Sequence, residues 1–223
     1  LKVGVGRRRR MSQGAKKAGR TVDDGGSGGK TVMAAMAAAL AKALGEEFTL
    51  VEAVPMYQIQ AFVFVRVSHL HHTSRVAVSQ VPTFRAAYNK LGTHTTPTML
   101  ARRKGGVAVT LSLGRTSFCF VSAHLAAHQG ERGQLLERNR DSARILQNIL
   151  GDGRDACSCF DHLFFFGDLN YRLGSADLPD KVSAARPDGL QAWRDVYKEI
   201  RSHEWEALYA RDQLQAQIQA GKA

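Results

Sequence analysis

The chain has 223 residues, which is enough for one domain with a substantial core. Hydrophobic residues make up 44% of it, and no apolar run approaches the roughly 18 residues that a membrane span needs, so an integral membrane protein is not expected. The net charge of +11 is concentrated in residues 1–30, which hold nine Lys and Arg against two Asp. Three cysteines in a chain of this length do not indicate a disulfide framework, and a reducing, cytoplasmic setting is expected.

The basic, Gly- and Ser-rich residues 1–30 are predicted to be a disordered tail, and residues 31–223 a folded domain. The charge of the tail suits peripheral contact with an anionic membrane, and less specifically nucleic acid. A solvated tail without a dedicated partner is the alternative.

Helices and strands are expected in a mixed order after the tail. In chain order the pattern predicts a helix over 31–45, strands over 48–54 and 59–67, a loop over 82–103, paired antiparallel strands over 107–113 and 118–123, a helix over 131–150, a strand over 160–166 and a broken helix over 190–219. Such a mixture of hairpins, strands and helices predicts an α+β sandwich.

The strongest functional signal follows the last predicted strand, in Phe164-Phe165-Phe166-Gly167-Asp168-Leu169-Asn170-Tyr171-Arg172. A strand that is apolar at every position is expected to be buried on both faces. Residues i and i+2 of an extended segment share a side, so Asp168 and Asn170 should converge, with Arg172 beside them if the extension persists. A carboxylate, an amide and a guanidinium suit activation of water and binding of a phosphate. An ordinary Asx-type turn is the alternative.

Two other motifs are not assigned a function. Residues 24–31 end in Gly-Lys-Thr like a phosphate-binding loop, but Asp24 stands in place of its first Gly and no buried strand precedes it, so a flexible linker is expected. His124 and His128 are spaced like two zinc ligands of a helix. Leu125 stands where the zinc-protease pattern has Glu, so zinc is not expected.

The string around Asp168 resembles the signature of the inositol polyphosphate 5-phosphatases, which reads aromatic-x-Gly-Asp-x-Asn-aromatic-Arg. Two upstream blocks resemble further motifs of that family in the same order: Lys104-Gly105-Gly106-Val107, and Ser122-Ala123-His124-Leu125-Ala126-Ala127-His128 followed by Glu137-Arg138-Asn139-Arg140-Asp141. The resemblance covers roughly residues 33–220. It implies the four-layered αββα sandwich of the DNase I-like type, present here in part.

The resemblance implies Mg²⁺-dependent removal of the 5-phosphate from a phosphoinositide or a soluble inositol polyphosphate by in-line attack of water. In it, Asp168 would activate or orient the water, Asn170 would hold the phosphoryl oxygen, and a protonated His124 would contact the scissile phosphate. Supporting or substrate-binding roles are implied for Lys104, Arg138, Asn139, Asp141 and Arg172. A cytoplasmic protein, peripheral at membranes, is expected, and a nucleic-acid substrate is disfavoured.

The chain departs from the family pattern in ways that bear on activity. Arg103 stands where the family has Asn before its Lys-Gly-Gly, and Ser142 where it usually has Tyr. The family's Mg²⁺-binding glutamate is not found, because Glu46, Glu47 and Glu52 lie in other contexts, so the metal ligand is unassigned. The family's Pro-Pro-Thr-Tyr-Lys, Trp-x-Asp-Arg and Ser-Asp-His segments do not occur in these 223 residues. We therefore expect the central part of a catalytic domain, inactive by itself.

Two functions of other classes stay open. A metal-dependent nuclease of the same superfold is one, because Gly-Asp-x-Asn alone is shared with that group, although the Ala-Ala-His and Arg-Asn-x-Asp context argues against it. The other is a non-catalytic protein that binds anionic membranes through the basic tail. Plasmid nicking and salt-sensitive liposome binding distinguish these alternatives.

Overall fold

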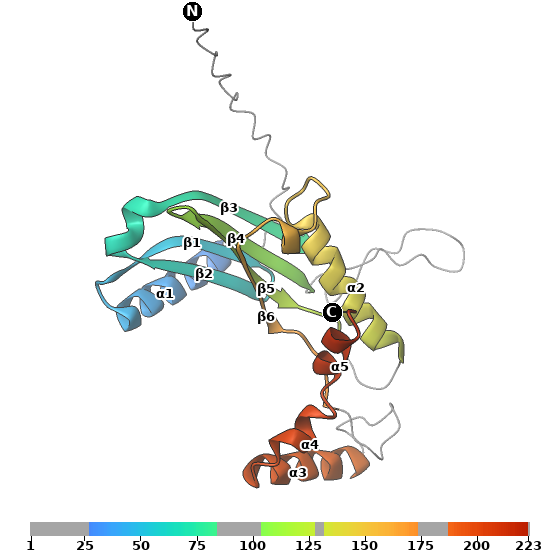
Figure 1. Cartoon of the computed structure of the whole chain (residues 1–223). Coiled ribbons are helices and arrows are strands. Elements are labelled where there is room, and N and C mark those ends of the chain that lie inside the picture. The colour runs from blue at the N-terminus through green and yellow to red at the C-terminus, as the bar shows by residue number, and fades with distance from the viewer. Residues whose placement is uncertain (1–26, 84–103, 128–131, 174–186, 223) are drawn as a thin grey trace, which may run out of the picture.

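Two β-sheets and seven helical segments are seen in the computed structural model, which describes residues 27–83, 104–127, 132–173 and 187–222 (Figure 1). The elements are α1 (Ser27–Leu44), β1 (Phe48–Met56), β2 (Ile59–Arg66), the 3₁₀ turn η1 (Val67–His72), β3 (Thr73–Pro82), β4 (Gly105–Leu113), β5 (Thr116–His124), α2 (Arg132–Asn148), the 3₁₀ turn η3 (Ala156–Ser158), β6 (His162–Asp168), α3 (Pro187–Arg201), α4 (Trp205–Tyr209) and α5 (Gln213–Gln219). Most of the predicted tail and of the predicted 82–103 loop lies outside the described residues.

The layers follow the order helix, sheet, sheet, helix (Figure 1). Strands β1 and β2 form a two-stranded antiparallel sheet, which α1 contacts through β1. The second sheet has the order β3-β4-β5-β6, with α2 against it; β5 and β6 run parallel and the other neighbours antiparallel. The α+β, four-layered architecture predicted from the sequence is therefore confirmed.

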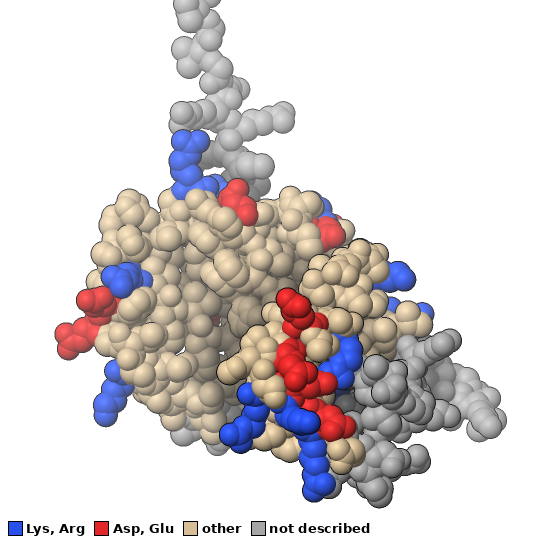
Figure 2. Space-filling view, turned by 60° about the horizontal axis from the view of Figure 1, so that its bottom comes forward, with Lys and Arg blue, Asp and Glu red and all other residues tan. Residues whose placement is uncertain are grey.

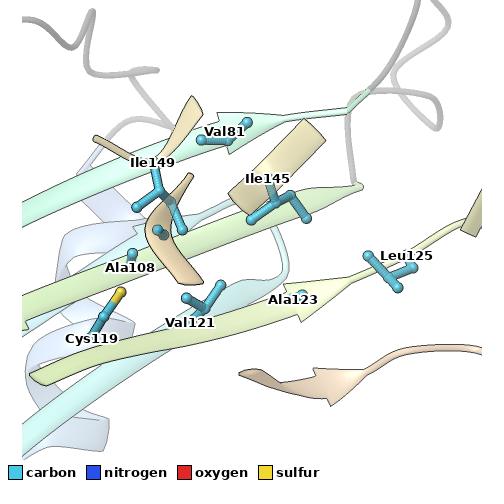
Figure 3. Packing of buried hydrophobic residues seen from close by; sticks show 9 residues of the cluster. Val81, Ala108, Cys119, Val121, Ala123, Leu125, Ile145 and Ile149 are labelled. Atoms are coloured by element: carbon cyan, nitrogen blue, oxygen red, sulfur yellow. The ribbon is translucent and has the colours of Figure 1, made fainter. Parts of the chain in front are cut away.

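The face of the four-stranded sheet toward α2 forms one hydrophobic core. Ala108 of β4 and Val121 of β5 are completely buried there, and Ile145 and Ile149 of α2 pack onto them (Figure 3). Because side chains alternate along a strand, these residues come from every second position. This packing fixes α2, and with it the polar residues of that helix, against β4 and β5.

The opposite face of β4 contributes to a second core between the two sheets. Val107 and Val109 pack there with Met56 of β1 and Ile59 of β2, and Met56 is fully buried. Strand β4 is thus the element buried on both faces, and it joins the two cores.

The expectation that the Phe164–Phe166 strand is buried on both faces is wrong. Phe165 packs on the α2 side, but Phe164 and Phe166 are 48% and 49% exposed. The reason is position, because β6 is the edge strand of its sheet and the described sheet opposite has only two strands. Phe164 still stacks on Phe120 of β5, with ring centroids 5.3 Å apart.

Two further expectations are refined by the structure. The broken helix predicted over 190–219 is three helices, α3, α4 and α5, and the side chain of Asp212 caps α5 by accepting from the Leu214 N–H at 2.8 Å. Strand β3 was not predicted at all. Among the described residues, no helix is long and apolar enough to cross a membrane.

Candidate active site

Three polar residues meet where neighbouring strands of the four-stranded sheet begin or end. His124 closes β5, and its strand register places it opposite Gly105 of β4 on one side and Asp168 of β6 on the other. Lys104 directly precedes β4. The hydrogen-bond ladder of the sheet thus brings residues from three distant segments together where the strands end. We call these residues the strand-end cluster: Lys104, His124 and Asp168.

The imidazole of His124 is the centre of the strand-end cluster. Its Nε2 lies 3.3 Å from Asp168 Oδ2, and the same nitrogen contacts the Nζ of Lys104. The His124 side chain is 22% exposed, whereas that of Asp168 is 65% exposed. The carboxylate therefore faces solvent and incoming ligands, while the imidazole forms the floor behind it.

Burial and neighbouring charge act on both bases of the cluster. Burial, with the Lys104 charge as a second cause, holds the pKa of His124 below its ordinary value, and Asp168 opposes the shift. Burial also lowers the pKa of Lys104, against the attraction of Asp168 and Asp141. The burial of His124 and the Lys104 charge thus disfavour the protonated imidazole that the resemblance implies.

Two glycines let the strand ends that carry the strand-end cluster approach each other closely. Gly167 has φ 126°, and a Cβ added there would lie 2.2 Å from the carbonyl oxygen of Ala123. Gly105 has φ 147°, and its added Cβ would lie 2.3 Å from the carbonyl oxygen of Val81. Any larger residue at either position would push a strand end away from its neighbour.

Asn170 and Arg172 follow the strand-end cluster but do not continue the extended strand. Asn170 adopts the left-handed conformation, with φ 57°, so the chain turns after Asp168. The Asn170 amide donates to the Leu125 carbonyl at 3.1 Å, and its Oδ1 accepts from Arg172 Nη2 at 2.9 Å. The predicted proximity of Asn170 and Arg172 is therefore real, but a turn and a hydrogen bond produce it.

Asp141 of α2 holds the segment that follows His124. Its Oδ2 accepts from the Ala126 N–H at 3.1 Å, and its carboxylate also bonds to the side chain of Thr83. The residue is buried, and burial raises its pKa to about 6 although both hydrogen bonds act in the opposite direction. Asp141 thus fixes the segment after His124 to α2.

Arg138 and Asn139 of α2 contact the chain beyond Asn170. The Asn139 Oδ1 accepts from the Tyr171 hydroxyl at 2.8 Å, and its Nδ2 donates to Gln217 Oε1 at 2.8 Å. The guanidinium carbon of Arg138 lies 5.7 Å from the centre of the Tyr171 ring, in a cation–π arrangement. Both residues therefore contact the turn that follows Asp168.

Sequence reasoning missed two glutamines of α5. Gln213 Oε1 accepts from Arg138 Nη2 and from the Arg172 backbone N–H, each at 3.1 Å. One helical turn later, Gln217 accepts from Asn139. The only signal that could have indicated them is their spacing of four residues, which puts both on one helix face.

The described residues do not form a metal site by themselves. Within the described ranges, no group of three or more His, Cys, Asp and Glu side chains is arranged to hold a metal ion, and His128 lies outside those ranges. Asp168 offers one exposed carboxylate, and the side-chain oxygen of Asn170 is already bonded to Arg172. Among the described residues, the donors toward a metal ion thus reduce to one exposed carboxylate, which suits an ion that completes its coordination with substrate phosphates and waters.

Comparison with known proteins agrees with this architecture. The sequence profile of endonuclease/exonuclease/phosphatase family 2 matches residues 16–223. Type I inositol polyphosphate 5-phosphatase 8 of Arabidopsis thaliana is 33% identical over 125 residues, which is 53% of this chain and 22% of that protein. Synaptojanin-1 of Rattus norvegicus is 30% identical over 176 residues, which is 79% of this chain and 9% of that protein.

A solved structure shows the same fold. It is the inositol polyphosphate 5-phosphatase domain of a synaptojanin in complex with inositol (1,4)-bisphosphate and calcium ion, with a TM-score of 0.56 at 22% identity, over 79% of this chain and 42% of that one. The chain thus spans less than half of the solved domain, and less than a quarter of the two relatives described above.

Proposed function

The chain belongs to endonuclease/exonuclease/phosphatase family 2, and from this premise we propose that its site serves removal of the 5-phosphate from an inositol polyphosphate or a phosphoinositide. One observation carries the proposal: Lys104, His124 and Asp168 converge at adjoining strand ends, beside the hydrogen-bonded Asn170 and Arg172 pair. A phosphate ester needs cationic and amide donors for its oxygens and a base for the attacking water, and these groups supply both.

The exposure of each group suggests its role. The Asp168 carboxylate faces solvent and can accept a proton from, or orient, an attacking water, while His124 holds it from one side. Lys104 offsets the charge that develops on the phosphoryl oxygens. The Asn170 amide has one N–H directed to the Leu125 carbonyl, which leaves its second N–H as a donor to a phosphoryl oxygen.

We propose Mg²⁺ as the divalent ion, bound together with the substrate. Mg²⁺ in proteins commonly uses one or two carboxylates and completes its coordination with substrate phosphates and waters. When bound, it would neutralise phosphate charge. Removal of Mg²⁺ with EDTA is expected to weaken binding of inositol 1,4,5-trisphosphate, and addition of excess Mg²⁺ should restore it.

Binding of inositol phosphates tests the function on the 223-residue chain. We expect inositol 1,4,5-trisphosphate to bind at least about tenfold more tightly than inositol 1,4-bisphosphate by calorimetry, because the extra phosphate meets the cationic cluster. Lys104→Met should remove most of this difference. Arg115→Met, at the exposed β4–β5 turn, is the matched control and should not. Equal affinity for the two ligands would contradict the proposal.

Two further measurements separate related outcomes. Robust Mg²⁺-dependent phosphate release by these 223 residues would overturn the expectation that this part is inactive alone, while supporting the phosphatase. Plasmid nicking without inositol phosphate binding would favour the nuclease.

We also propose a cytoplasmic location with peripheral membrane contact through the basic tail. On the face shown in Figure 2, acidic and basic side chains of the described residues lie interspersed, so that face has no single charge to attract a lipid surface. Residues 1–30 carry most of the net positive charge. Pelleting with phosphatidylserine liposomes should therefore be lost at high salt and on deletion of those residues.

A further inference from the structure

The side chain of Gln213 lies between two arginines of the site. Its Oε1 accepts from Arg138 Nη2 and from the backbone N–H of Arg172, each at 3.1 Å. Its own backbone N–H donates to the Arg172 carbonyl at 3.0 Å, and Asp212 pairs with Leu173 in an isolated β-bridge. The start of α5 is therefore joined to the backbone on both sides of the Arg172 side chain.

This junction reaches Asn170 through the Arg172 guanidinium. Arg172 Nη2 donates to Asn170 Oδ1 at 2.9 Å, and this bond determines which way the amide faces. Asn170 lies at φ 57°, a left-handed conformation that asparagine tolerates better than most residues, and its side chain is bonded at both ends there. A displacement of Arg172 would consequently change the orientation of the Asn170 amide.

The charges of Arg138 and Arg172 act on each other near Gln213. Burial is the main cause that lowers the pKa of Arg138, and the nearby Arg172 charge lowers it further. Their repulsion acts to separate Arg172 from Arg138. The amide oxygen of Gln213 accepts from the Arg138 guanidinium and from the Arg172 backbone N–H, so it ties both residues to the start of α5 although their charges repel.

We propose that Gln213 is a positioning residue of the phosphatase site: its amide oxygen holds Arg172, and Arg172 orients the Asn170 amide for the phosphoryl group. The identity of the ligand rests on the proposed function, but the hydrogen-bond chain from Gln213 to Asn170 does not. The two can therefore be tested separately on the same protein.

Three variants of the 223-residue chain isolate the side chain of Gln213. Gln213→Ala removes Oε1 and leaves the backbone bond from residue 213 to the Arg172 carbonyl. Gln213→Glu keeps an oxygen in place, and its carboxylate accepts from the arginine and the amide at least as well. Gln219→Ala makes the same chemical change at an exposed position of the same helix and serves as the control.

Hydrogen exchange and amide NMR give the readout that does not need a ligand. In Gln213→Ala we expect the Arg172 amide to exchange at least about tenfold faster and the Asn170 side-chain amide resonances to shift. Gln213→Glu should retain the slow exchange, and Gln219→Ala should match the unaltered protein. Affinity for inositol 1,4,5-trisphosphate should fall about tenfold in Gln213→Ala and recover in Gln213→Glu.

The outcomes separate the two claims. Unchanged Arg172 exchange and Asn170 resonances in Gln213→Ala would overturn the positioning role, and so would a Gln213→Glu variant that behaves like Gln213→Ala while circular dichroism shows a folded chain. If the unaltered chain does not bind inositol 1,4,5-trisphosphate, the proposed function fails, and the exchange and NMR data still decide the role of Gln213.

Discussion

Asp141 is a carboxylate on which burial and hydrogen bonding act in opposite directions. The Ala126 N–H and the Thr83 side chain stabilise its charged form, but burial outweighs them and raises its pKa to about 6. In the unfolded chain the group has its ordinary value of 3.8. The folded state therefore binds this proton more tightly, so the contribution of Asp141 to stability is fully present below pH 3.8 and is lost as pH rises through about 6.

Asp141→Asn removes this titration, so we expect the difference in unfolding free energy between the variant and the unaltered chain to rise with pH. Between pH 4 and pH 7 the change should be on the order of 2 kcal/mol in favour of the variant. Urea unfolding at both pH values measures it. His124, whose pKa is lowered, loses its contribution as pH falls, but it does so in both proteins and cancels from the difference. A difference that stays flat, or falls with rising pH, would contradict the assignment.

Sequence and structure agree best at the residues that carry charge at strand ends. His124 and Asp168 could be predicted because each closes a strand in a recognisable motif, and the sheet register then makes them neighbours. Gln213 could not be predicted, since a glutamine in a helix is usually solvated. Its role depends on where α5 docks, 41 residues beyond Arg172 along the chain, and tertiary packing alone decides that.

At the scale of elements, β5 and β6 can pair closely only because residue 167 is glycine. Gly167 has φ 126°, and an added Cβ would lie 2.2 Å from the Ala123 carbonyl oxygen and 2.8 Å from the Ala123 nitrogen. Both are backbone atoms, which cannot rotate away as the end of a side chain can. This close approach also sets the distance between His124 and Asp168.

Gly167→Ala should therefore destabilise the chain by more than about 2 kcal/mol, through backbone strain and displacement of β6. Gly114→Ala is the matched control: it also has a positive φ, 62°, but no atom lies within 4 Å of its added Cβ. Strain alone should make it cost about 1 kcal/mol. Chemical denaturation compares the two variants, and equal losses would show that the close approach to Ala123 is unimportant.

The edge position of β6 explains why its burial was predicted wrongly. Phe164 and Phe166 have the pattern of a central strand, but hydrophobicity does not reveal which strand will lie at the edge of a sheet. Strand β3 was missed for the opposite reason. Its Val76 and Val78 are 39% and 50% exposed, and polar residues flank this short apolar run on both sides, so the segment gives only a weak strand signal. In both cases the neighbouring strands decide how far the side chains of the strand are buried.

At the scale of the whole molecule, β4 joins the two hydrophobic cores and carries Lys104 at its start. Ala108 faces α2, whereas Val107 and Val109 face the β1–β2 sheet. Met56 fills the space beside Gly105, because a Cβ added to that glycine would lie 2.7 Å from the Met56 methyl carbon. Through Met56, the two-stranded sheet thus supports the strand from which Lys104 extends.

Met56→Ala should test whether the two sheets unfold as one unit. The cavity left by this fully buried side chain is expected to cost about 2–5 kcal/mol. Met36→Ala, at a position of α1 that is 40% exposed, should change stability by less than about 0.5 kcal/mol. If β4 couples the cores, hydrogen exchange in Met56→Ala will quicken by a similar factor in β1–β2 and in β4–β5. Faster exchange confined to β1–β2 would instead mean that the two-stranded sheet opens separately and leaves the strand-end cluster intact.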